Sequence, residues 1–170
     1  MEASLQVSNA CAADAGIISR IIEQSIRLGC AIDHRNDPRI VDTWTRTKTL
    51  EHIEHWFCDS RLYVNLARLQ DKPVGVAMAA SNGRLAFCYV QPQWFRRGVG
   101  RALVRDLETW LGARGLAQVH LNSTRTSEAF YQRLGYCHAA PSFNVAGLQA
   151  IPMYRELDGD AGKADRGPKS

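Results

Sequence analysis

The chain has 170 residues, of which 45% are hydrophobic and 22% are charged, and its formal net charge at pH 7 is +4. This length allows one domain with a sizeable core and is too short for two ordinary domains. The chain has no apolar run of the roughly 20 residues that a membrane-spanning helix needs, and its basic residues form no stripe with interleaved aromatics of the kind that binds nucleic acid.

The first part of the chain predicts one short strand followed by helices. Leu5–Val7 has the pattern of a strand, and Asp14 stands where it can cap a helix. Pro38 suits the first turn of a second helix that reaches Thr47, and Leu50–Phe57 predicts a third. The apolar positions of the first helix recur at helical spacing, namely Ile17, Ile18, Ile21, Ile22 and Ile26.

The middle of the chain predicts a meander of three strands. They are Leu62–Leu69, Val74–Ala80 and Arg84–Val90, each a run rich in apolar residues and bounded by turn residues. Turn residues separate the strands, first at Asp71–Pro73 and then at Ser81–Gly83. Consecutive strands joined by short turns are expected to pair in an antiparallel sheet.

After Gly98 the pattern changes to alternating helices and strands. The first helix has an apolar stripe and stops at Gly115; the stripe consists of Val99, Leu103, Leu107, Trp110 and Leu111. Further elements are predicted as a strand at Gln118–Ser123, a helix at Ser127–Leu134, and strands at Tyr136–Ala139 and Ile151–Leu157. Residues 1–157 are therefore expected to form one domain, and the polar, Gly-rich residues 158–170 a disordered tail.

The segment from Val90 to Leu103 predicts an anion-binding site. It consists of a strand end, a polar loop, two arginines, a Gly-x-Gly and the start of a helix. The first N–H groups of a helix have no internal partner and lie at the positive end of its dipole, so they bind anions. Four arginines add donors that suit phosphate oxygens, namely Arg96, Arg97, Arg101 and Arg105. The expected ligand carries a pyrophosphate.

Two common phosphate-binding motifs do not fit this segment. A dinucleotide fingerprint needs a third small residue where the chain has Leu103, and an acidic residue about 20 positions further on. A Walker loop needs Gly-Lys-Ser/Thr, which the chain lacks.

A second motif, Phe130-Tyr131-x-x-Leu134-Gly135-Tyr136, follows the predicted strand end Leu121–Ser123. Together with the Gly-x-Gly helix it strongly resembles the GCN5-related N-acetyltransferases, the GNAT superfamily. The resemblance runs roughly from Gln6 to Leu157 and is firmest over Phe87–Gly135. Shorter segments resemble a bacterial subgroup of acetyltransferases with unassigned substrates, namely Ser25–Arg27, Cys30-Ala31, Asp33-His34 and Trp44.

The resemblance implies an α+β fold in which a mixed, mostly antiparallel central sheet of six to seven strands has helices on both faces and splayed central strands. It also implies that acetyl-CoA is the cosubstrate, that no metal takes part, and that a primary amine attacks the thioester directly in a ternary complex. The cosubstrate contacts that it implies come from Cys88, Tyr89, Val90, Arg96, Arg97, Gly98, Val99, Gly100, Arg101, Ala102, Asn122, Ser127, Phe130, Tyr131 and Arg133.

By this resemblance Tyr131 lies next to the CoA sulfur. A phenol has a pKa near 10 and an alkyl thiol one near 8.5, so complete proton transfer to the leaving thiolate would be uphill by about 2 kcal/mol in water. We therefore expect a hydrogen bond from Tyr131 to the developing thiolate. A backbone N–H around Val90 is expected to stabilise the oxyanion, a contribution of about 2.7–4 kcal/mol.

The general base is harder to assign. A lysine-like amine with a pKa near 10.4 must lose a proton before it can attack, but the strand Leu85–Val90 contains no carboxylate. The candidates are His120, on the neighbouring strand, and Asp33 and His34, in the loop expected to border the acceptor site. For His120 a solvent-facing strand residue is the competing interpretation.

Other features either depart from the family pattern or have a simpler interpretation. Phe95 stands where the family usually has Gln or Arg, and Thr124 stands where many relatives carry Asn. His52 and His55 share one helical face, but no further residue completes a metal site.

The five cysteines are scattered and odd in number, which predicts reduced thiols. With no signal-peptide pattern at the start, we expect a cytoplasmic protein. The alternative function is a non-catalytic acetyl-CoA-binding module in regulation or assembly, which the missing strand carboxylate favours and Tyr131 disfavours. The sequence leaves dimerisation open, as well as the choice between a small molecule and a peptide or protein as acceptor.

Overall fold

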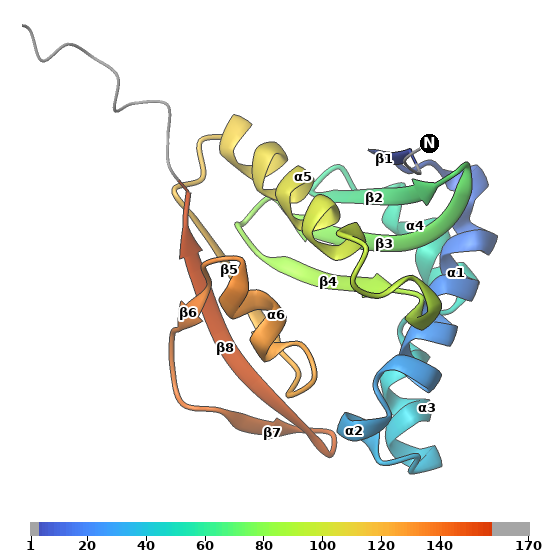
Figure 1. Ribbon diagram of the computed structural model, residues 1–170, viewed down its shortest axis with the longest axis vertical. Coiled ribbons are helices and arrows are strands. Elements are labelled where there is room, and N and C mark those ends of the chain that lie inside the picture. Colours follow the sequence, from blue (N-terminus) through green and yellow to red (C-terminus); the bar gives the residue numbers. More distant parts are fainter. Residues whose placement is uncertain (1–3, 158–170) are drawn as a thin grey trace, which may run out of the picture.

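The computed structural model describes residues 4–157 (Figure 1). Its first sheet has four antiparallel strands in the order β1-β2-β3-β4. They are β1 (Leu5–Asn9), β2 (Leu62–Leu69), β3 (Lys72–Ala80) and β4 (Leu85–Val90). The predicted meander is confirmed, although the turn between β2 and β3 lies one residue earlier than expected because Gln70 and Asp71 both have positive φ.

The second sheet is built around the long strand β8 (Leu148–Glu156). This strand pairs antiparallel with β5 (Gln118–Ser123) along one edge and with β6 (Cys137–His138) along the other, and its first residues pair with β7 (Phe143–Val145). The two sheets meet at a parallel bridge between Arg84 and His120. Beyond that bridge β4 and β5 diverge, as Figure 1 shows. The α+β fold with splayed central strands is therefore confirmed.

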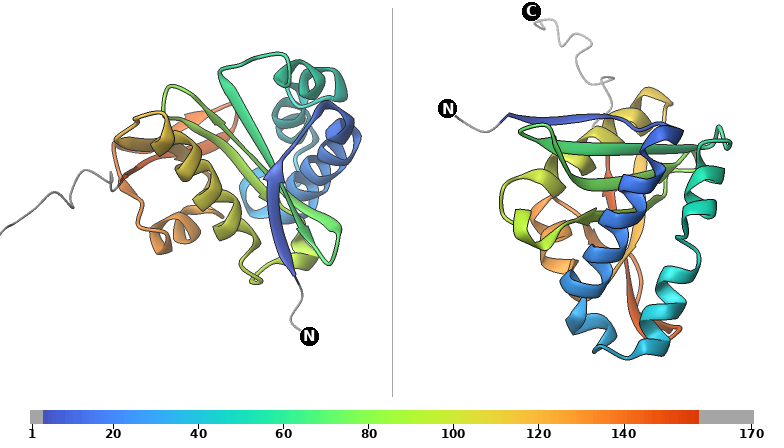
Figure 2. Two further views of the ribbon diagram at one scale, coloured as in Figure 1. Left: turned by 90° about the horizontal axis from the view of Figure 1, so that it is seen from above. Right: turned by 90° about the vertical axis from the view of Figure 1, so that its right-hand side faces the viewer.

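Helices cover both faces of the first sheet (Figure 2). One face carries α1 (Ala15–Gln24) and α4 (Leu50–Trp56), whose buried residues pack on the sheet together with Val64, Leu66 and Val76. The opposite face carries α5 (Val99–Ala113), and α6 (Glu128–Arg133) joins α5 in the core between the two sheets. The remaining turns and helices are η1 (Ala12–Asp14), the π-helical η2 (Ser25–Gly29), α2 (Ala31–His34), α3 (Pro38–Arg46) and η3 (Pro92–Trp94).

The start of the chain differs from expectation in two details. Asp14 does not cap α1 through its side chain. Its carboxylate instead accepts from the Cys11 N–H at 3.0 Å and from Arg68 at 3.4 Å, so it closes the turn that precedes the helix. Ile17, expected in the core, has 37% of its surface exposed.

The end of the chain contains a hairpin that the sequence does not predict. Strands β7 and β8 are joined by a two-residue turn in which Ala146 has a φ of 50° and Gly147 one of 82°. Turns of this kind usually carry Asn-Gly, and Ala in the first position hides the signal. The predicted tail, residues 158–170, lies outside the described residues.

Gly75 on β3 lets α5 approach the sheet closely. A Cβ there would lie 2.9 Å from Leu103 Cδ1 and 3.0 Å from Val99 Cγ1, and both of these side chains are buried. Because neither has room to move, we expect Gly75→Ala to lower the free energy of unfolding in urea by about 1–3 kcal/mol.

A matched control is Gly112→Ala, near the end of α5, where nothing lies within 4 Å of the added methyl group. It is expected to raise the free energy of unfolding by up to about 1 kcal/mol, because Ala favours helix over Gly. If both variants had the same stability, close packing at Gly75 would not limit the approach of α5.

Candidate active site

The loop between β4 and α5 is held in an irregular conformation. Gln91 is buried, and its side chain donates to Gln24 of α1 at 2.8 Å. Further along, Arg96 and Gly98 have φ values of 62° and 78°, in the left-handed region. Gly98 is the N-cap of α5, where Gly carries no steric penalty for this conformation. The loop thereby aligns its last peptide groups with the start of the helix.

A row of backbone donors is free at this helix start. Within residues 4–157, none of the N–H groups from Arg96 to Arg101 donates a hydrogen bond, and no side chain caps α5. The 15-residue helix adds the positive end of its dipole. The structure therefore has the backbone geometry of an anion-binding site at the predicted position.

Three of the four predicted arginines are available to this site. Arg96, Arg97 and Arg101 are exposed, and within the described part of the chain none of them pairs with a carboxylate. Arg97 lies over the Trp94 ring, 5.4 Å from its centroid.

The prediction for Arg105 is wrong, because its guanidinium is already occupied. It contacts Glu108 Oε1 at 2.5 Å and donates to the Leu134 carbonyl at 3.1 Å. Glu108 is itself buried and also accepts from Arg155 at 2.7 Å. Arg105 therefore belongs to a buried charge cluster. The sequence could not reveal this, since Leu134 and Arg155 are far along the chain.

The diverging strands leave two edges without a strand partner, and we call this feature the split. The Gln91 N–H donates to Val74 of β3 at 3.0 Å. Because successive residues of a strand turn their backbone groups to opposite sides, Tyr89 also bonds toward β3, whereas Cys88 and Val90 present theirs to the split. An extended molecule with amide groups could pair with this edge as a strand would.

Tyr131 of α6 is buried beside the split. Burial raises the pKa of its phenol well above the usual range, and the neighbouring Cys88, Tyr136 and Tyr89 raise it further. Phe130 packs against Gly100, where an added Cβ would lie 3.0 Å from its ring. The helix that carries Tyr131 is thus in direct contact with the anion-binding turn.

Cys88 is half-buried. Its Sγ contacts the Gly100 carbonyl at 3.9 Å, and burial raises its pKa to about 12. It is therefore protonated at neutral pH and poorly suited to act as a nucleophile.

The three candidate bases lie in very different surroundings. His34 is fully buried; its Nδ1 accepts from the Asn36 N–H at 3.0 Å and its Nε2 contacts the Ile26 carbonyl at 2.7 Å. Both ring nitrogens are therefore engaged. His120 is exposed near the end of the split where β4 and β5 still pair. Asp33 faces Thr126.

Tyr89 is surrounded by residues from the helical segments, and the sequence predicts only some of these neighbours. The Trp44 indole of α3 donates to the Tyr89 hydroxyl at 2.9 Å. Cys30 lies close enough to Tyr89 to influence the pKa of that phenol. Burial and then the Asp33 carboxylate raise the pKa of Cys30 itself to about 12. Asp33 was expected near the acceptor, Cys30 and Trp44 entered the sequence analysis only through the resemblance to a bacterial subgroup, and Thr126 had no recognisable signal.

The other predicted contacts lie at the periphery. Asn122 and Arg133 are exposed, and Ser127 bonds to Thr124 before α6. Thr124, which stands where many relatives carry Asn, thus stabilises the turn that leads into α6.

The described residues carry neither a metal cluster nor a membrane span. Residues 4–157 contain no group of three His, Cys, Asp or Glu side chains arranged to hold a metal ion. His52 and His55 are exposed and bond within their own helical segment. Within the same range, every helix is too short or too polar to cross a membrane.

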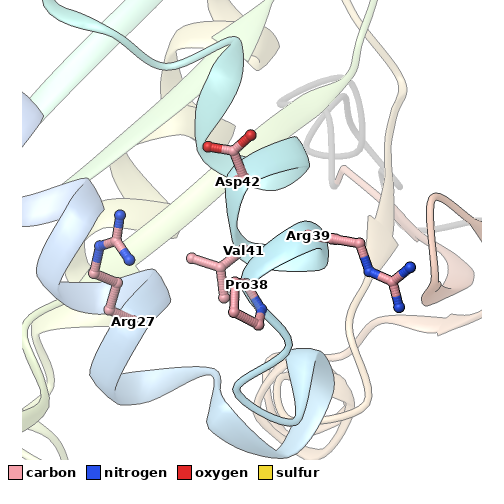
Figure 3. Close-up of a pocket in the computed structure, with 5 residues that line it drawn as sticks. All are labelled: Arg27, Pro38, Arg39, Val41 and Asp42. Atoms are coloured by element: carbon pink, nitrogen blue, oxygen red, sulfur yellow. The ribbon is translucent and has the colours of Figure 1, made fainter.

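A shallow hollow of about 440 Å³ lies between η2 and α3. Figure 3 shows Pro38 and Val41 at its centre, Arg27 on one side and Asp42 near them, with the Arg39 side chain turned away. None of these residues belongs to the predicted cosubstrate site, and Arg27 is paired with Glu23 at 3.1 Å.

Comparisons with known proteins agree with this geometry. A family model described as "Acetyltransferase (GNAT) domain" matches residues 32–157. The Bacillus subtilis (strain 168) protein YyaT is 28% identical over 92 residues, which cover 52% of this chain and 62% of YyaT. The chain spans 65% of a second curated relative from the same organism, so it covers less than two thirds of the length of either protein.

Two solved structures share the fold. A GCN5-related N-acetyltransferase from Rhodopseudomonas palustris has a TM-score of 0.77 at 23% identity, covering 92% of this chain and 97% of that one. The PaiA N-acetyltransferase from Thermoplasma acidophilum, solved in complex with coenzyme A, has a TM-score of 0.74 at 13% identity, covering 91% and 99%.

The different surroundings of Arg105 and Arg101 lead to a paired prediction. Arg105→Ala removes one partner of the buried Glu108 and is expected to lower the free energy of unfolding by about 1–3 kcal/mol. Arg101→Ala is expected to change stability by no more than about 0.5 kcal/mol and to weaken the binding of inorganic pyrophosphate several-fold. Urea unfolding and calorimetric titration measure the two effects, and a reversed pattern would contradict these assignments.

Proposed function

The chain belongs to the GNAT family of acetyltransferases, and on this basis we propose that it transfers the acetyl group of acetyl-CoA to a primary amine. The observation that carries the proposal is the arrangement along the split. A row of free N–H groups lies at the start of α5, a strand edge presents Cys88 and Val90, and the buried phenol of Tyr131 lies beside them. The free N–H groups suit the pyrophosphate of acetyl-CoA, the strand edge suits its amide-bearing arm, and the phenol suits its sulfur.

In this proposal the pyrophosphate binds the N–H groups of Arg96 to Arg101, with charge from Arg96, Arg97 and Arg101. The Gly-x-Gly turn lets the backbone approach without side chains intervening. The pantetheine amides pair with the free edge of β4. That PaiA was solved with coenzyme A supports acetyl-CoA as the cosubstrate of this fold.

The chemistry then follows from the groups on the split. The neutral amine attacks the thioester carbonyl carbon, and its nitrogen forms the new C–N bond. The Val90 N–H stabilises the oxyanion, a contribution typically of about 2.7–4 kcal/mol. The C–S bond breaks with its electron pair on sulfur, the nitrogen loses its proton, and the thiolate takes up one to give free CoA. Because burial raises the pKa of Tyr131, its phenol acts as a hydrogen-bond donor to that sulfur.

We place this reaction in the cytoplasm. The five cysteines, all within the described residues, are free thiols, the form that a reducing compartment maintains. The acceptor is an amine on a small molecule, a peptide or a protein. A non-catalytic acetyl-CoA-binding module would need the anion site and the strand edge but would have no use for a phenol at the sulfur.

Tyr131→Phe separates these two functions. The variant keeps the ring but loses the hydroxyl, so we expect unchanged acetyl-CoA affinity by calorimetry and a kcat lowered by roughly 10²-fold. Turnover is followed by thiol release with a panel of amines. The matched control is Tyr136→Phe, since its ring lies 5.5 Å from that of Tyr131 and its hydroxyl has no partner in the described structure.

Tyr136→Phe is expected to keep kcat within about threefold of wild type. If neither wild type nor variant bound acetyl-CoA, the assignment of the anion site would be wrong, and so would the proposed acetyltransferase activity. Tight binding without turnover across a broad panel of amines would favour the binding module.

The dependence of rate on pH tests the state of Tyr131. Only the neutral amine reacts, so kcat/KM is expected to rise about tenfold per pH unit below the acceptor's own pKa. Because the pKa of Tyr131 is raised, the phenol keeps its proton and causes no fall in rate below about pH 10. A descending limb between pH 8 and 10 that disappears in Tyr131→Phe would contradict this role.

A further inference from the structure

The short helix α2 is tied to the second sheet across the split. Asp33 Oδ1 accepts from the Thr126 N–H at 3.2 Å, and Oδ2 accepts from the Thr126 hydroxyl. Among all hydrogen bonds within residues 4–157, these two alone join the helical segment 15–56 to residues 118–157. One side-chain pair therefore carries the polar connection on this face of the molecule.

This pair completes a ring of neighbouring groups around the split. The Cys30 carbonyl accepts from the Asp33 N–H at 3.0 Å, and its thiol lies close enough to Tyr89 of β4 to influence the pKa of that phenol. Thr126 stands two residues before α6, whose Tyr131 returns to Cys88 and Tyr89 on β4. The ring thus runs from β4 through Cys30, Asp33 and Thr126 to α6 and back. An acceptor approaching from the helical face meets this ring before it reaches the thioester.

The segment that carries Asp33 is a short helix between two irregular joints. It is four residues long, follows the π-helical η2 and is followed by Arg35 and Asn36, which both have positive φ. His34 anchors it to η2 through the Ile26 carbonyl. Its outer surface is uncovered at Ile32, of which 74% is exposed, and Leu28 of the preceding η2 is 70% exposed. Short segments between irregular joints open at lower free-energy cost than a packed core, and His34 is the one residue of this helix that is buried.

We propose that Asp33 and Thr126 form a latch over the acceptor side of the split: the acceptor enters when the pair opens, and the closed pair fixes the start of α6 and so the position of Tyr131. Asp33 is then a positioning residue rather than the general base. The role of the acceptor rests on the proposed function, but the latch itself concerns only residues of this chain.

The thiol of Cys30 reports on the latch without any substrate. We expect N-ethylmaleimide to modify Cys30 about tenfold faster or more in Asp33→Ala and in Thr126→Val, as read by peptide mass spectrometry. Thr126→Val is the more telling variant, because it retains the Asp33 charge that raises the pKa of the thiol. The exposed thiols Cys11, Cys58 and Cys137 serve as internal references whose rates stay constant.

Two further variants control for structural damage. Thr109→Val removes a threonine hydroxyl that bonds only within α5 and is expected to leave Cys30 as slow as in wild type. Thr126→Ser keeps a hydroxyl at this position, so Cys30 should be labelled as slowly as in wild type. This control holds even if Thr126→Val loosens the protein enough to speed the labelling of Cys88 as well. An unchanged Cys30 rate in Thr126→Val, or faster labelling in Asp33→Ala alone, would overturn the latch.

Activity provides a separate readout. If the latch positions Tyr131, Asp33→Ala lowers kcat about tenfold while the acetyl-CoA affinity stays within about twofold. Faster Cys30 labelling in a protein that acetylates no amine would support the latch and refute the proposed function. Normal acetyl transfer with unchanged Cys30 labelling would support the proposed function and refute the latch.

Discussion

The divergence of β4 and β5 is the constraint on which the rest of the structure depends. The strands share one bridge, between Arg84 and His120, after which each loses a neighbour on one side. Backbone N–H and C=O groups next to a core are costly unless they are paired. The fold therefore retains a strand edge whose backbone groups have no strand partner, and a ligand that carries amides can form hydrogen bonds with them.

Two connections of unequal strength hold the diverging sheets together. On the face of α5 and α6, the buried Glu108 joins Arg105 and Arg155, and Arg105 reaches the Leu134 carbonyl at the end of α6. A buried carboxylate with two guanidinium partners is costly to break. On the opposite face the hydrogen-bonded connection is the pair of Asp33 and Thr126, which is partly exposed, and Ile40 of α3 lies close to Gly147 in the β7–β8 turn. The difference makes one side a fixed joint and leaves the other able to open.

Local sequence signals predicted most of this fold, and non-local partners account for what they missed. The glycines at 98 and 100, the turn residues between the strands and the apolar stripe of α5 are local signals, so they could be read directly from the sequence. Arg105 could not be assigned, because its partner Leu134 is 29 positions away. The buried state of His34 depends on Ile26 in the preceding π-helical turn. The β7–β8 hairpin was missed because Ala146 occupies a left-handed position that normally shows Asn or Gly.

The neutral groups that line the split matter for how an amine could be deprotonated when β4 carries no carboxylate. Cys30, Cys88, Tyr89 and Tyr131 surround the split as neutral groups, because burial raises the pKa of each. An ammonium ion entering this ring would lose hydration and find only Asp33, whose oxygens already accept from Thr126. An amine that loses its proton at the rim, where the latch meets solvent, avoids that cost and arrives ready to attack. For the proposed acetyl transfer, these neutral groups favour deprotonation of the amine at the mouth of the site, where the proposed latch opens, over deprotonation by a strand carboxylate.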